Sequence, residues 1–153
     1  MMENRPDPSI WPEYKAELRR GYFNADGALK SDFVQRYSEA VARSFLVGSR
    51  HITNTQLRNF YNHVRTASSV FALTDRGPMA ETTLINKINK LDAIVSYNKG
   101  RDNINIPDEF VDFVRCNLEA CRSAKDVISG FIPHFETVVG YFKYAEQTGR
   151  GRR

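Results

Sequence analysis

The stretch that decides the fold class of this chain is TNTQLRNFYNHVR, residues 53–65. Thr53 and Gln56 have the spacing of a capping box, in which each side chain binds the backbone N–H of the other residue at the start of a helix. Because successive residues turn about 100° around a helix axis, apolar residues that recur every three or four positions gather on one face. On this helix they are Leu57, Phe60, Tyr61, Val64 and Phe71. The pattern predicts an amphipathic α-helix that begins near residue 54.

The same helical period recurs in four more segments, each with a stripe of apolar residues that predicts a buried face. These segments are residues 33–45, 84–95, 110–121 and 131–142. Ser31 is the expected N-cap of the first segment, and Gly48 is its expected end. Pro107 is expected just inside the helix of residues 110–121, and Pro133 either kinks the last helix or starts it afresh. No segment alternates like a β-strand, so we predict an all-α fold, a compact bundle of about five helices.

Residues 1–30 differ in composition from the rest of the chain and are predicted to form an N-terminal arm. They hold three of the six prolines and one short helical stretch, Pro12 to Arg20, which Gly21 should end. Four aromatic residues give the arm enough apolar area to pack on the body: Trp11, Tyr14, Tyr22 and Phe23. We therefore predict three parts, namely the arm at 1–30, a helical bundle domain at 31–147 and a disordered basic tail at 148–153.

The composition excludes several classes of protein. With 153 residues, 41% of them hydrophobic, the chain suits one soluble globular domain. A transmembrane helix needs ~20 consecutive apolar residues, and the N-terminus lacks the pattern of a secretory signal, so we expect a cytoplasmic protein without membrane contact. Cys116 and Cys121 are expected to be reduced thiols. His51, His63 and His134 show no metal-ligand spacing, so we expect no metal and no cofactor.

The net charge of +4 is unevenly distributed along the sequence. Residues 1–49 balance to zero, whereas residues 50–101 hold eight Lys or Arg against three acids, a net +5. Residues 102–149 hold four basic and eight acidic side chains, a net −4, and the last four residues add +3. Because phosphate binding depends on clustered charge, the middle segment suits a polyanionic partner, although a solvated helix face can have the same composition.

Arg58 and His63 allow a different interpretation of the opening stretch. Four residues separate them, a spacing found in a class of small all-α ribonucleases whose Arg and His act together on a phosphodiester. On a helix the two side chains lie roughly 140° apart, so one phosphate meets one of them more easily than both. A dimer could bring four such groups together, although no nearby carboxylate orients the histidine. The alternative function is therefore a dimeric, metal-independent ribonuclease, and a helical protein-interaction module without RNA contact is a third possibility.

Three motifs that follow one another along the chain resemble those of a known family. Residues 53–61 resemble the Thr-x-x-Gln-Ile/Leu-Arg-x-Phe-Tyr helix of the small subunit of type III-A CRISPR effector complexes, the Csm interference complex. Residues 91–101 are similar to that family's Leu…Ala-Tyr-x-x-x-Arg segment, with Ser96 where Ala is usual. Residues 131–144 resemble its closing Phe…Phe-Glu-Ala-x-Val-x-Tyr-x-Lys helix, with Thr137 in place of Ala.

The resemblance implies a small helical bundle without an active site, which stacks as a filament beside the guide-bearing backbone subunits. Its implied partners are guide RNA, target RNA, the backbone and large subunits of the Csm complex, and further copies of itself. The expected RNA-binding residues are Gln56, Arg58, Lys99 and Arg101, which match the motifs, and Arg50, Arg65, Lys87 and Lys90, which join them on charge and helical phase. Such residues would hold phosphates, while pairing between guide and target reads the sequence.

Overall fold

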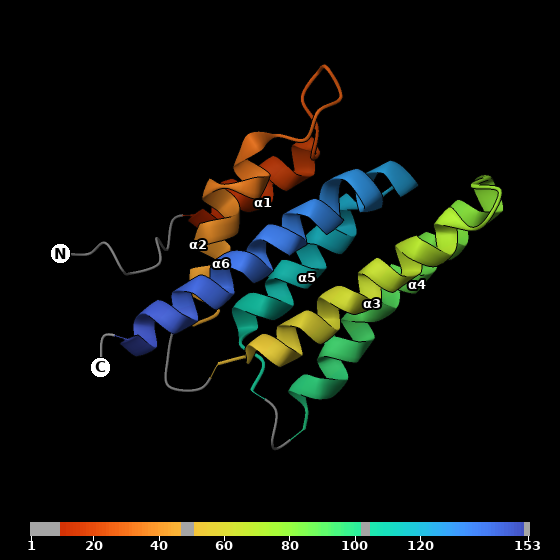
Figure 1. Cartoon of the computed structure of the whole chain (residues 1–153). Coiled ribbons are helices and arrows are strands. Elements are labelled where there is room, and N and C mark those ends of the chain that lie inside the picture. The colour runs from red at the N-terminus through yellow and green to blue at the C-terminus, as the bar shows by residue number, and fades with distance from the viewer. Residues whose placement is uncertain (1–9, 47–50, 102–104, 152–153) are drawn as a thin grey trace.

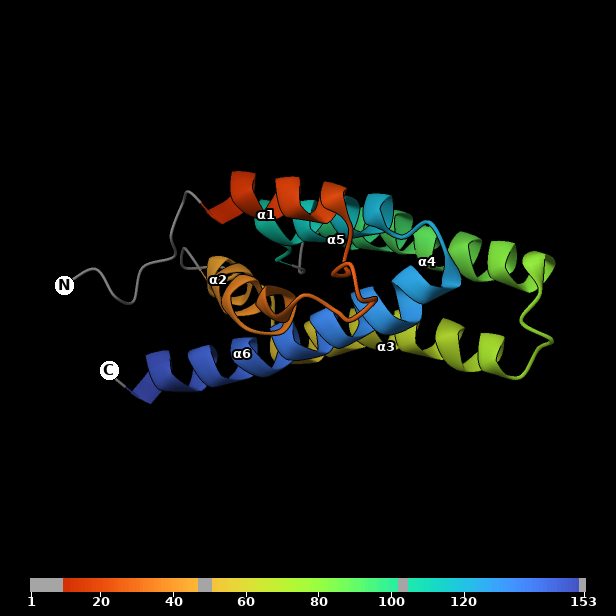
Figure 2. The same cartoon turned by 90° about the horizontal axis from the view of Figure 1, so that it is seen from above.

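The structure is a computed structural model that describes residues 10–46, 51–101 and 105–151. The six α-helices of these residues form two layers of three, with α1, α5 and α4 in one layer and α2, α6 and α3 in the other (Figure 1, Figure 2). Their bounds are α1 Ile10–Arg20, α2 Arg36–Ser44, α3 Asn54–Ala72, α4 Pro78–Lys99, α5 Asp108–Ala120 and α6 Ile132–Gly151. Apart from one isolated β-bridge, the described residues contain no strand. The predicted all-α fold is confirmed, and α1 brings the expected five helices to six.

The helix α3 begins where the sequence predicts. The Gln56 N–H donates to Thr53 Oγ1 (3.1 Å), and Gln56 Oε1 accepts from the Thr53 N–H (2.9 Å), so the capping box is complete. α4 begins at Pro78, whose ring presets the backbone of a first helical turn and whose missing N–H would have no partner there. α3 and α4 pack as an antiparallel pair, and their connected end projects beyond α5 and α6 (Figure 1, Figure 2).

The buried aromatic pair of α3 anchors this helix to the core between the layers. The ring centroid of Phe60 lies 5.3 Å from that of Phe110 in α5, and the centroid of Tyr61 lies 5.4 Å from that of Phe135 in α6. Aromatic contacts of this kind contribute about 0.5–1.5 kcal/mol each beyond the burial of their area. α3 is therefore fixed along its inner face, and its outer face is open to solvent.

The N-terminal helix packs into the same core. Ile10, Tyr14 and Leu18 of α1 are buried, and α1 contacts α2 and α5. Gly21 ends α1 with a φ of +106°, a left-handed conformation that favours glycine. Tyr22, the next residue, is fully buried. The first helix is thus held by side chains that point into the bundle.

A chain of buried hydrogen bonds joins this N-terminal segment to α5 and α6. The Tyr22 hydroxyl donates to Asn117 Oδ1 (2.7 Å), and Asn117 Nδ2 donates to the Tyr14 hydroxyl (2.8 Å). Tyr14 donates in turn to His134 Nε2 (2.7 Å), and His134 Nδ1 donates to the Phe33 carbonyl (2.5 Å). Because a carbonyl oxygen only accepts, the imidazole is neutral with its proton on Nδ1. Each buried polar group in this series of hydrogen bonds has a partner, which offsets the cost of its burial.

One predicted helix is divided in the structure. The sequence predicts a single helix over residues 33–45, whereas a 3₁₀ helix at Ser31–Val34 precedes α2. Gln35 lies at the junction with non-helical backbone angles (φ −134°, ψ −95°). The Phe33 carbonyl just before it accepts from the buried His134 Nδ1 (2.5 Å). This tertiary hydrogen bond keeps the 3₁₀ turn separate from α2. The tertiary contact therefore decides the structure at Gln35, against the helical pattern of the local sequence.

The last two prolines lie at helix starts. Pro107 is the N-cap of α5 and therefore lies just outside the helix, where the sequence predicted it just inside. Pro133 is the second residue of α6 and follows a π-helical turn at Asp126–Phe131. Since proline has no N–H, the regular α-helical ladder cannot continue through it, and Pro133 marks the start of α6.

α6 runs to Gly151, past the predicted boundary at residue 147. The expected end at Gly48 and the last two residues lie outside the described residues.

Candidate nucleic-acid interface

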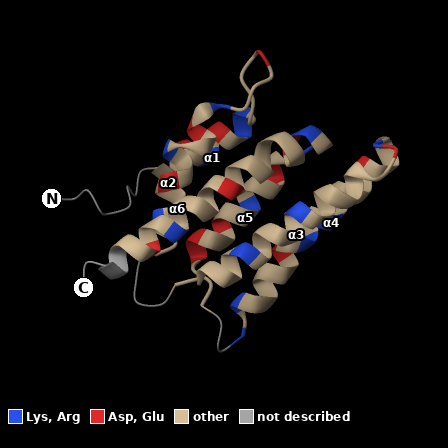
Figure 3. Cartoon of the chain, viewed as in Figure 1, with Lys and Arg blue, Asp and Glu red and all other residues tan. Residues whose placement is uncertain are grey.

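Lys and Arg residues occur along both helices of the α3–α4 hairpin (Figure 3). Between residues 54 and 101 there are seven Lys or Arg and three acids. All three acids are engaged within the chain: Asp92 Oδ1 accepts from Arg115 Nε (3.0 Å), Glu81 Oε2 from the Ala124 N–H (2.7 Å) and Asp75 Oδ1 from the Gly77 N–H (2.9 Å). These hydrogen bonds direct the acids toward α5, toward the segment before α6 and into the connecting loop. Among the described residues, none of the three acids forms an ion pair with a Lys or Arg of the hairpin.

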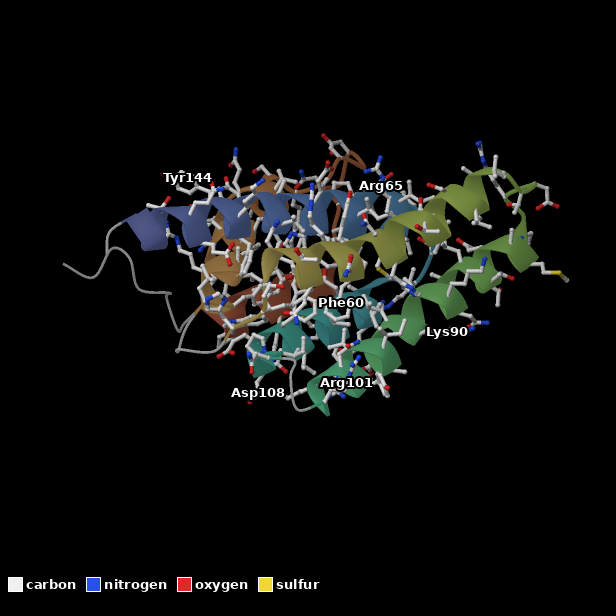
Figure 4. The ribbon with its side chains drawn as sticks, turned by 60° about the horizontal axis from the view of Figure 1, so that its bottom comes forward. Phe60, Arg65, Lys90, Arg101, Asp108 and Tyr144 are labelled. Atoms are coloured by element: carbon white, nitrogen blue, oxygen red, sulfur yellow. The ribbon has the colours of Figure 1, made fainter. Side chains whose placement is uncertain are left out.

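Four of the hairpin's side chains share one flank of α4. Lys87, Lys90, Tyr97 and Arg101 fall within an arc of about 80° around the helix axis. Although α4 ends at Lys99, the Arg101 N–H still donates to the carbonyl three residues earlier (3.1 Å), so the chain continues to turn. Figure 4 shows Lys90 and Arg101 along this side of the helix. We call these four residues the α4 flank.

A shallow groove of about 490 Å³ lies between α3 and the first part of the α4 flank. Its lining residues are Asn59, Asn62, His63, Thr66, Ala67 and Val70 from α3 and Lys87 and Lys90 from α4. No acidic residue is among them, and neither lysine has an ion pair with any residue that the structure describes. A polyanion in this α3–α4 groove would meet two unpaired ammonium groups beside amide, hydroxyl and imidazole groups.

His63 joins the two helices at the groove. Its Nε2 lies 3.0 Å from the carbonyl oxygen of Lys87, and because that oxygen only accepts, Nε2 donates the proton. Arg58 lies on the other flank of α3, so a single chain does not bring together the two groups of the ribonuclease alternative. The histidine's visible role is structural, since it fixes α4 against α3 beside Lys87.

Arg58 and Arg65, both predicted to bind RNA, lie on the side of α3 that faces α6. Burial raises the pKa of Tyr61, the carboxylate of Glu136 in α6 raises it further, and the charges of Arg65 and Arg58 lower it. Figure 4 shows Arg65 on the side of α3 away from Lys90. Because a carboxylate lies in the same neighbourhood, this side is a less favourable phosphate site than the α3–α4 groove.

The remaining predicted residues differ in their availability. Lys99 Nζ donates to the Ile106 carbonyl (2.7 Å) and pairs with Asp108 Oδ1 (2.9 Å), so its ammonium already ties α4 to the start of α5. Gln56 Oε1 already accepts a hydrogen bond in the capping box. The position of Gln56 around the helix axis places it on the side of α3 that faces α4. Arg50 lies outside the described residues. Of the predicted set, Lys87, Lys90 and Arg101 therefore share one flank of α4, and helical phase places Gln56 on the side of α3 that faces α4.

Three residues outside the predicted set also lie at this surface. Asn59 and Asn62 line the groove, and Tyr97 belongs to the α4 flank with 69% of its surface exposed. A signal for Tyr97 was present in the sequence, because it follows Lys90 by seven residues and precedes Arg101 by four. These are both intervals that return to the same side of a helix.

Other chemistry has little support in the described residues. They contain no group of three His, Cys, Asp or Glu that could hold a metal ion. Cys116 and Cys121 are free thiols, and burial raises the pKa of each to about 12, so neither is a thiolate near neutral pH. None of the described helices is long and apolar enough to cross a membrane.

Comparison with known families gives a match to Csm2 Type III-A over residues 29–148. The chain belongs to this family. The resemblance found in its motifs is thereby confirmed, and the family is that of the small subunit of the type III-A CRISPR effector complex, the Csm complex. Comparisons with curated proteins and with solved structures gave no match. The matched range includes α2 to α5 and most of α6, and therefore both helices that form the α3–α4 groove.

Proposed function

We propose that this chain is a non-catalytic small subunit of a type III-A CRISPR complex that binds RNA phosphates through the α3–α4 groove and the α4 flank. The observation that supports this most is the pair Lys87 and Lys90, two unpaired ammonium groups in a groove lined by no acid. Arg101 extends the positive charge along the same flank. From Lys87 to Arg101 the flank spans about 21 Å at 1.5 Å per residue.

Such a surface suits the RNA backbone rather than particular bases. Lysine is a point charge on a flexible stem, so it holds phosphates without reading the base sequence. In an RNA-guided complex the sequence is read by pairing between guide and target, and protein subunits supply backbone contacts. The subunit therefore needs neither a base-reading loop nor a nucleophile to contribute. Its proposed RNA partners are the guide and the target of the Csm complex.

We also propose that copies of the chain associate head to tail beside the backbone subunits. The +5 of residues 50–101 and the −4 of residues 102–149 would attract each other between neighbouring copies. The projecting end of the hairpin exposes Leu73 (88%) and Met79 (84%), two apolar side chains that a neighbour could cover. A heterologous contact of this kind repeats along a filament. Leu73→Ser with Met79→Ser should then lower the average mass at high protein concentration in analytical ultracentrifugation.

The RNA-binding proposal is tested by reversing charge at the proposed surface. The triple variant Lys87→Glu, Lys90→Glu and Arg101→Glu should lose affinity for single-stranded RNA in a filter-binding assay. The control variant carries the same charge change on other elements: Arg19→Glu, Arg122→Glu and Lys143→Glu, all at exposed positions. Equal losses in the two variants would show that net charge alone is responsible and would contradict the proposed surface.

Removing charge gives a quantitative measure of the same contacts. For single-stranded nucleic acid the slope of log affinity against log salt is about 0.7 per phosphate contact. Lys87→Gln with Lys90→Gln should reduce the slope by about 1.4 if each lysine neutralises one phosphate. An unchanged slope would mean that the two lysines do not contact phosphate.

An RNA digest in EDTA, with His63→Ala beside the unchanged chain, tests the ribonuclease alternative.

A further inference from the structure

Tyr97 is a large aromatic residue that lies outside the buried core. Its surface is 69% exposed, whereas the aromatic rings of the core are almost fully buried. It lies on the α4 flank, two helical turns after Lys90 and one turn before Arg101. At 1.5 Å per residue, Lys90 is about 10 Å away along the axis and Arg101 about 6 Å away. A large ring is thus held in water between two basic groups.

The ring of Tyr97 lies beside a cation. The guanidinium carbon of Arg101 lies 5.8 Å from the centroid of the Tyr97 ring, a cation–π arrangement. Because most of the surface of Tyr97 remains exposed, the contact leaves room for a second planar group to lie against the side chain. Sites that bind single-stranded nucleic acid combine an aromatic ring for stacking with positive charge beside it, and Tyr97 and Arg101 provide both.

We propose that Tyr97 stacks on an unpaired RNA base while Lys90 and Arg101 hold the neighbouring phosphates. This inference rests on the proposed RNA binding and specifies the ligand, which is RNA with at least one unstacked base. Bases inside a duplex are stacked on each other and do not offer a face, so duplex RNA would gain only the phosphate contacts. Stacking tolerates any base, because every base has a π-face, and so the site remains independent of sequence.

Tyr144 provides a matched control within the same chain. It is also a tyrosine and is 63% exposed, and it lies on α6. Figure 4 shows it at the far edge of the molecule from Lys90 and Arg101. If an exposed tyrosine were enough to bind RNA, both residues would contribute. If the α4 flank is the site, Tyr97 alone will contribute.

The test uses the full chain with three probes: an oligouridine strand, an RNA duplex of equal length and inorganic polyphosphate. Tyr97→Leu keeps apolar bulk without a ring, Tyr97→Phe keeps the ring, and Tyr144→Leu is the control. Tyr97→Leu should weaken oligouridine binding by about five- to tenfold, the lower part of the range for base–aromatic stacking. Tyr97→Phe and Tyr144→Leu should bind like the unchanged chain. Duplex and polyphosphate binding should be the same for all variants.

Salt separates stacking from charge. Because stacking releases no counterions, the loss in Tyr97→Leu should be the same factor at every salt concentration, and the salt slope should not change. Oligouridine binding by Tyr97→Leu that equals that of the unchanged chain would overturn the inference while leaving the proposed RNA binding intact. An equal loss for oligouridine and polyphosphate would also overturn it. If the unchanged chain binds neither RNA, the proposed function fails and this inference fails with it.

Discussion

Lowering the pH from 7 to 5 should destabilise this protein mainly through one buried residue, His134. Its imidazole is fully buried, accepts from Tyr14 at Nε2 and donates to the Phe33 carbonyl from Nδ1. A proton added to Nε2 would face the O–H of Tyr14, whose oxygen already accepts from Asn117. Burial lowers the pKa of His134 to about 4, although the hydrogen bond to the Phe33 backbone raises it in part. The folded protein therefore resists protonation that the unfolded chain accepts.

The sign and the size of the effect follow from the two pKa values. In the unfolded chain the imidazole takes up a proton near its ordinary pKa of about 6.5, whereas in the folded protein it does so only near 4. Between these values the unfolded state binds more protons, so the free energy of unfolding falls as the pH falls. The full difference is about 3 kcal/mol, and about 2 kcal/mol of it is lost by pH 5. Glu17, whose pKa is lowered by its hydrogen bond to Lys30, loses its contribution only below its ordinary carboxyl range.

Urea unfolding followed by far-UV circular dichroism at pH 7, 6 and 5 measures this loss. The variant His134→Gln keeps every other titratable group, so the pH dependence between 6.5 and 4.5 should flatten even if the variant is less stable overall. Parallel decreases in both proteins would refute the assignment to His134. An independent measurement is the NMR titration of the ring in the folded protein, and a midpoint near 6.5 would contradict the reasoning without any variant.

Three further predictions concern the fold. Gly130→Ala should lower the free energy of unfolding by about 1–3 kcal/mol in urea titrations, because an added Cβ would lie 2.6 Å from the ring of Tyr22; a neutral result would mean that the ring moves aside at no cost. Thr53→Ala should cost about 1 kcal/mol in the same assay, since it removes the acceptor of the Gln56 N–H, and Thr53→Ser should restore most of the loss. Asn117→Leu should cost about 3 kcal/mol, because it leaves the Tyr22 hydroxyl without its carboxamide acceptor and removes a donor to a second buried hydroxyl; a loss below about 1 kcal/mol would show that these groups find other partners.

The parts of the fold that depend on neighbouring residues could be predicted from the sequence. The capping box of Thr53 and Gln56 is such a case, because both partners lie within one turn. The break at Gln35 is the opposite case. It depends on a hydrogen bond between Phe33 and His134, which are 101 residues apart. A helical period cannot reveal a carbonyl that a distant side chain will take, so the sequence predicted one helix where the structure has two.

The residues of the candidate interface also differ in how far the sequence could predict them. Lys87 and Lys90 were predicted from helical phase, and the structure leaves both of them unpaired in the groove. Lys99 lies within the same family motif as Arg101, yet its ammonium is engaged by Ile106 and Asp108 across the connection to α5. Whether a basic side chain is free depends on the acids that the fold brings near it. The sequence gives the sign of each charge but not its partner.

The molecule combines a tightly packed core with an open α3–α4 face, and this division would suit the proposed binding of RNA irrespective of its base sequence. The hydrogen-bonded chain from Tyr22 to His134 ties the N-terminal segment to α5 and α6, and aromatic contacts fix the inner face of α3. His63 then fixes α4 to α3 through a backbone carbonyl, so the positions of the lysine Cα atoms are set while their ammonium groups keep their rotational freedom. An RNA backbone bound in many sequence contexts presents phosphates that shift by small amounts, and long unpaired lysines can follow them. Stability and binding should therefore vary independently. Asn117→Leu should change unfolding without changing the salt slope of RNA binding, and Lys90→Gln should do the reverse.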